Sequence, residues 1–305
     1  MNSQETLALA ATLLAPAFFS LLGMGAFGSP VVAVLGELAA KSKKRIFYDK
    51  FGQQAGAMGR LLLVLLILVW GASCAVVYFR FPQLAERLIA PGAVFIEAAV
   101  ACAVFLLAGL IHFSTWKAMR QAKGAHIALG LLAAVASVTA LALAVPAKLM
   151  LNRPDGAADS LFGHPMALPL AVMYALLSVA CAAGLAAAYL VLRRNRDDFG
   201  RDYYNFSLPL AARWAVIPML GFLVCQGWLF AVLPETFRTM TLGTPLCWVW
   251  LGVAVLGLVC AALWLVVARS KTPLRLKGLC FLALALLWIM HTLSVTLFVN
   301  FMSML

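Results

Sequence analysis

The segment at residues 112–156, HFSTWKAMRQAKGAHIALGLLAAVASVTALALAVPAKLMLNRPDG, decides the fold. It contains the end of one apolar stretch, a basic turn, a second complete apolar stretch and an exit that carries proline. About 20 apolar residues cross a bilayer core as a helix, because only helices and closed barrels satisfy their backbone hydrogen bonds in lipid. The segment therefore predicts a membrane hairpin.

The composition of the whole chain agrees with this interpretation. Of the 305 residues, 65% are hydrophobic and 11% are charged, and the mean hydropathy is +1.00. These values exclude an ordinary soluble domain. We expect an all-α, polytopic transmembrane helix bundle that forms one transmembrane domain over residues 1–305. The eight expected crossings are residues 16–40, 60–80, 93–116, 127–150, 167–192, 214–233, 246–268 and 279–302.

The N-terminal apolar run is too long for a single crossing. It is interrupted by Pro16, Gly23, Gly25, Gly28 and Pro30. We expect residues 1–15 to be an outer-surface segment, with a short helix over residues 3–14. A cleaved signal peptide is the alternative, but an acidic residue and no basic one precedes the apolar run, which is the wrong charge for a signal peptide.

Charge predicts the orientation. Most of the 23 lysines and arginines lie in the loops after the first, third, fifth and seventh crossings. Because Lys and Arg are retained on the cytoplasmic side, both termini are predicted to be periplasmic. The net charge of +12 is then explained by topology and by anionic lipid of the bilayer. No nucleic-acid partner is required.

The seven cysteines form no CxxC or CxxCH motif. This spacing predicts no c-type haem, no iron-sulfur cluster and no zinc knuckle. No metal site and no catalytic residue are predicted from the sequence.

Candidate functional residues are the polar side chains at membrane depth, since such groups are costly there. Glu97 and His112 lie 15 residues apart in one crossing. At 100° per residue they fall within about 60° of one helix face. Glu97 is a candidate for a proton or quinone-headgroup contact, and His112 for haem binding or hydrogen bonding. The alternatives are a solvated carboxylate and a capping histidine.

Three further positions complete the prediction. His126 opens the fourth crossing close in depth to His112, as a bis-histidine b haem would need, although a place among the lipid headgroups is the alternative. His291 lies midway through the last crossing, where a satisfied buried imidazole is the alternative to a ligand. Gln226 could meet a quinone carbonyl or form a helix–helix hydrogen bond.

Several of these residues occur in an order known from one family. An acid follows Phe95 and Ile96, a Trp–Lys pair stands at 116–117, His126 opens the next helix, and residues 148–156 read KLMLNRPDG. This order resembles subunit I of the cytochrome bd quinol oxidases, with its LEG-type acid and its WMQxPxG-type motif. The resembling helices span residues 16–213, and three further transmembrane helices follow in 214–305.

The departures from that family limit what the resemblance implies. The family carries a haem-ligating histidine in the first helix, where this chain has Phe19 and Ser20. It carries another near the start of the fifth helix, where this chain offers Met173 as a candidate ligand, or the off-register His164. Phe105 replaces a second acid. The resemblance therefore does not imply a terminal oxidase.

What the resemblance does imply is a subunit of a bacterial respiratory electron-transfer complex in the inner membrane. It would interact with quinone, with one haem b or with both, and with periplasmic multihaem c-type cytochromes or a haem-bearing paralogue. Two alternatives remain open, a haem-free membrane anchor and a small-solute transporter.

Overall fold

The computed structural model describes residues 3–90, 94–151, 162–197 and 199–302. These residues are almost entirely helical and contain no strand. The elements are α1 (Ser3–Lys43), α2 (Ile46–Arg80), α3 (Pro82–Ile89), α4 (Val94–Ser114), α5 (Lys123–Leu151), α6 (Ala167–Asp197), α7 (Arg201–Val232), α8 (Glu235–Gly243), α9 (Leu246–Arg269), the 3-10 helix η1 (Pro273–Leu276) and α10 (Lys277–Met302).

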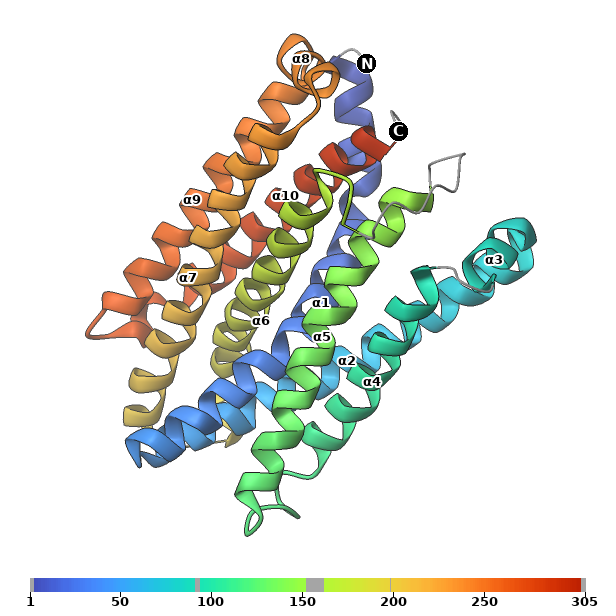
Figure 1. Cartoon of the computed structure of the whole chain (residues 1–305). Helices are drawn as coiled ribbons and strands as arrows, with labels where there is room; N and C mark the ends of the chain where they lie inside the picture. The colour runs from blue at the N-terminus through green and yellow to red at the C-terminus, as the bar shows by residue number, and fades with distance from the viewer. Residues whose placement is uncertain (1–2, 91–93, 152–161, 198, 303–305) are drawn as a thin grey trace.

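Within these residues, 8 segments are long and apolar enough to cross a membrane. They are α1, α2, α4, α5, α6, α7, α9 and the segment Pro273–Phe301, which contains α10. The prediction of an all-α multi-pass bundle with eight crossings is confirmed. The beginning of α1 and the end of α10 lie at the same end of the bundle (Figure 1). The periplasmic placement of that end stays a prediction.

The first helix differs from the expectation. Instead of a separate surface helix followed by a crossing, α1 runs without a break from Ser3 to Lys43 and includes Pro16 and Pro30. Transmembrane helices tolerate proline because neighbouring helices help to satisfy the freed backbone groups. At 1.5 Å per residue α1 is about 60 Å long, roughly twice the thickness of a bilayer core. The placement of residues 1–15 at the outer surface stays a prediction.

Two other helices begin earlier than their apolar runs. α2 begins at Ile46, and α7 begins at Arg201. Their first two turns contain buried side chains, among them Phe51 and Tyr203. Packing therefore extends both helices beyond the stretch that hydropathy alone marks.

Small residues bring α1 into backbone contact with its neighbours. A Cβ atom at Gly28 would lie 2.0 Å from the carbonyl oxygen of Ser178 in α6. One at Gly36 would lie 2.8 Å from the Cα atom of Gly52 in α2. Close approach at small residues is typical of membrane helices, where packing replaces the hydrophobic effect. Because α1 also contacts α5 and α10, it is the helix that organises the bundle (Figure 1).

A polar network joins three helices at the end away from the termini. Gln54 of α2 donates from Nε2 to Asp197 Oδ2 at 2.9 Å, and Tyr203 of α7 donates from its hydroxyl to Gln54 Oε1 at 2.6 Å. Arg193 pairs with Asp197 within α6. The amide of Gln54 thus links the ends of α2, α6 and α7.

Candidate functional site

A cavity of about 730 Å³ lies between α1, α2, α4, α5, α6 and α10. It occupies the half of the bundle that carries the termini, since it is lined by the first half of α1 and the second half of α10. Most of its wall is apolar. Phe19, Leu66, Trp70, Leu141 and Phe298 are among the lining residues.

The polar side chains that line this cavity include Ser20, Ser73, Lys148, Tyr174 and His291. The Nε2 atom of His291 in α10 lies 3.0 Å from the Oγ atom of Ser20 in α1. His291 is fully buried, while Ser20 is half-buried, so the hydroxyl stands in front of the imidazole. Lys148 of α5 also lines the cavity and stacks on the Phe298 ring at 4.7 Å. The cavity therefore offers several hydrogen-bond donors in a mostly apolar wall.

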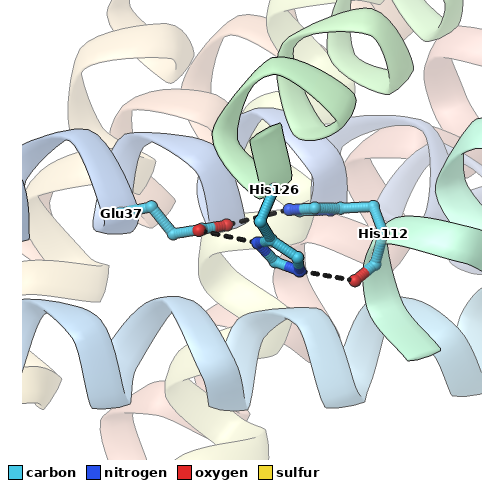
Figure 2. A group of neighbouring side chains, drawn as sticks. All are labelled: Glu37, His112 and His126. Atoms are coloured by element: carbon cyan, nitrogen blue, oxygen red, sulfur yellow. Dashed lines mark hydrogen bonds and ion pairs between the residues drawn. The ribbon is translucent and has the colours of Figure 1, made fainter. Parts of the chain in front are cut away.

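A second group of side chains is buried at the opposite end of the bundle. His112 Nε2 of α4 and His126 Nδ1 of α5 each lie 2.8 Å from a carboxylate oxygen of Glu37 in α1 (Figure 2). His126 Nε2 lies 3.0 Å from the main-chain oxygen of His112. Glu37 and His112 are 0% exposed and His126 is 2% exposed. Three helices thus place two imidazoles and one carboxylate in contact inside the protein.

Charged and aromatic side chains cover this group from the side of the α4–α5 turn. Lys123 lies 3.9 Å from Glu37 Oε2 and forms an ion pair with Asp49 of α2. Its ammonium also lies 4.6 Å from the centre of the Trp116 ring, and that ring packs edge-on against His126. Lys123 and Asp49 are each about one-third exposed, so they separate the buried group from solvent.

The structure separates the predicted site residues into several places. His112 and His126 meet, as expected, whereas Glu97 is exposed and is not among the described residues that line the cavity. Gln226 donates from Nε2 to Met173 Sδ at 3.0 Å, so these two form the helix–helix contact between α7 and α6. The KLMLNRPDG motif extends into residues 152–156, which lie outside the described residues.

Sequence reasoning did not identify Glu37, Lys148 or Ser20 as site residues. Glu37 was not identified because Lys41, Lys43 and Lys44 follow it in the sequence, and this pattern is typical of a charged helix end. A signal was present in the small residues beside it, since Ala33, Gly36 and Ala40 lie on the same side of α1 and favour a helix contact.

The fold has a counterpart among solved structures. One chain of the bd oxidase from Geobacillus thermodenitrificans superimposes with a TM-score of 0.75, covering 97% of this chain and 87% of that chain at 12% sequence identity. This chain has a bd-oxidase-like fold. No protein family matches the sequence, and no curated protein does. At this identity the likeness establishes the fold alone.

A haem is the cofactor that such a fold suggests, and the two candidate places fit it poorly. The rings of His112 and His126 are 4.5 Å apart between centroids, and both aim a nitrogen at Glu37, so no macrocycle fits between them. Around the cavity, His291 is the only imidazole among the described lining residues, and its Nε2 is bonded to Ser20. Lys148 is the only cation there for the two haem propionates.

Proposed function

We propose that this chain is a quinone-binding membrane subunit of a respiratory electron-transfer complex in the bacterial inner membrane. The observation that carries the proposal is the cavity, whose mostly apolar wall also contains the polar side chains of Ser20, Ser73, Lys148, Tyr174 and His291. A quinone has an apolar isoprenoid tail and two carbonyl oxygens that only accept hydrogen bonds. The bd-oxidase-like fold supports a respiratory role.

The donors are suited to a quinone headgroup. When His291 Nε2–H donates to Ser20 Oγ, the single hydrogen of the Ser20 hydroxyl is left for a ligand oxygen, and the Lys148 ammonium carries three more hydrogens. Hydrogen bonds in which one partner is charged are about twice as strong as neutral ones. The apolar walls would hold the ring and the first tail units, as is usual for small-molecule sites with few polar groups.

Phe105 supports a role without the oxygen chemistry of the family that the sequence resembles. It replaces the acid expected there, is fully buried and stacks on Phe27 with ring centroids 4.7 Å apart. Aromatic packing thus fills a place where a proton-carrying group would otherwise stand. The predicted cytochrome partners stay a prediction, and a haem-free anchor that binds no quinone is the alternative function.

The test is a titration of the purified chain in detergent with a short-tailed quinone. Ala144 of α5 lines the cavity and is exposed, so Ala144→Trp should fill the cavity without disturbing the core. We expect the Kd to rise roughly tenfold or more, since overpacking costs about 1–3 kcal/mol. Ala128→Trp is the matched control, because Ala128 is exposed on the same helix and does not line the cavity.

Equal affinities for wild type, Ala144→Trp and Ala128→Trp would place the quinone elsewhere on the protein. Absence of binding to the wild type would favour the haem-free anchor.

A further inference from the structure

We propose that Glu37, His112 and His126 form a binding site for one divalent first-row metal ion of the Zn²⁺ type. The group lies at the end of the bundle away from the cavity, so the proposal does not depend on the quinone function. One ligand atom from each residue lies within 4.8 Å of the others. Two imidazole nitrogens and a carboxylate oxygen are the ligands that Zn²⁺ and its neighbours prefer in three-residue sites.

The hydrogen bonds of His126 favour a metal ion over a closed protein network. Its Nδ1 faces a carboxylate oxygen and its Nε2 faces a main-chain oxygen, and both of these atoms only accept. A neutral imidazole has one N–H and can donate to one of them. With an ion bound at Nδ1, the single hydrogen resides on Nε2 and donates to the His112 carbonyl. Metal-binding histidines commonly show this outer hydrogen bond.

Burial supplies the second argument. The carboxylate of Glu37 is 0% exposed, and the nearest permanent cation, Lys123, is 3.9 Å away and one-third exposed. A buried carboxylate is costly unless a cation compensates it at close range. A divalent ion bound directly to Glu37 would compensate the charge better than the distant ammonium. The three side chains need to spread only slightly, because metal bonds of about 2.0–2.2 Å place ligand atoms roughly 3.3 Å apart.

The side chains around the three ligands leave a route by which the ion can enter and an open coordination position on the ion. Lys123 lies between Glu37 and Asp49 and is about one-third exposed. Rotation of its flexible side chain opens the group towards the solvent, and the vacated position can take a water molecule as fourth ligand. Trp116 stays packed against His126 and keeps the rest of the site dry.

The first experiment measures metal content. The full chain is stripped with a chelator, incubated with Zn²⁺, passed through a desalting column and analysed for zinc per protein. We expect about one ion per chain for the wild type and for His164→Gln, which changes a histidine in the turn before α6. Glu37→Gln and His126→Gln should each lose most of it. Zinc retained in both variants, or none in the folded wild type, would overturn the site.

A second measurement needs no variant, in case these substitutions prevent folding. Added Zn²⁺ should raise the Tm of the stripped wild type, because a ligand that binds only the folded state stabilises it. Co²⁺ should give visible absorption bands of a four-coordinate nitrogen and oxygen site. An unchanged Tm together with a six-coordinate Co²⁺ spectrum like that of the free ion would overturn the proposal.

A charge variant tests the role of Lys123, which separates the buried Glu37, His112 and His126 from solvent. Lys123→Met removes a positive charge next to the ion and should tighten Zn²⁺ binding by about tenfold at low salt, less at high salt. Lys117→Met is the matched control, since Lys117 lies in the same turn and is exposed. Weaker binding in Lys123→Met than in Lys117→Met would contradict the arrangement.

Discussion

His291 and Ser20 are joined by a hydrogen bond of 3.0 Å although 271 positions separate them in the sequence. The bond connects α10 to α1 beside the cavity and fixes the Ser20 hydroxyl in front of a buried imidazole. The last helix of the chain therefore helps to define the polar part of the proposed quinone site.

Ser20→Ala should weaken quinone binding without unfolding the protein. A neutral hydrogen bond contributes about 0.5–1.5 kcal/mol, so the Kd should rise by roughly 2-fold to 10-fold. Ser137→Ala is the control, because its buried hydroxyl bonds to the Ala134 carbonyl within α5, away from the cavity. Equal Kd values for both variants would remove Ser20 from the site.

The purified chain should bind no stoichiometric haem, since neither candidate place offers two suitable ligands. A dithionite-reduced minus oxidised spectrum should lack a b-type α band, and a pyridine haemochrome assay should give far less than one haem per chain. One haem per chain that is lost in His291→Ala would show that the cavity holds haem instead of quinone.

Gly28→Ala should destabilise the bundle. The new methyl group would meet the Ser178 carbonyl oxygen at 2.0 Å, and backbone cannot move aside cheaply. We expect a loss of about 1–3 kcal/mol or more, seen as a lower Tm in detergent. Gly71→Ala has nothing within 4 Å of the added atom and should be neutral or stabilising by up to about 1 kcal/mol. Similar Tm changes for the two variants would contradict the close contact of α1 and α6.

Gln54→Leu should cost more than the loss of one hydrogen bond. It leaves the buried Tyr203 hydroxyl without the acceptor at 2.6 Å, a penalty of about 1–3 kcal/mol. Adding Tyr203→Phe to Gln54→Leu should recover part of the lost stability, because the stranded hydroxyl is then gone. A double variant that is less stable than Gln54→Leu by the full cost of Tyr203→Phe alone would show that the two side chains act independently.

The transmembrane helices were predictable because hydropathy alone indicates them. A stretch of about 20 apolar residues has few alternatives to a membrane helix, and all eight were identified. Their ends were not, since the first turns of α2 and α7 are held by packing of residues such as Phe51 and Tyr203. Hydropathy does not report such contacts.

The candidate sites were predictable only in part. The sequence placed His112 and His126 at one depth, and they do meet. The sequence could not show that Glu37, which lies 75 residues before His112, completes the group. Glu97 shares a helix with His112 but is exposed, while His112 is buried. Its proposed contact with quinone stays a prediction.

The most direct test of the quinone assignment is to count quinone in organic extracts of the chain purified from its native membrane. We expect close to one quinone per wild-type chain and per Ala128→Trp chain, and much less in Ala144→Trp. Wild-type protein that is folded but carries no quinone above the level of the surrounding lipid would overturn the quinone assignment.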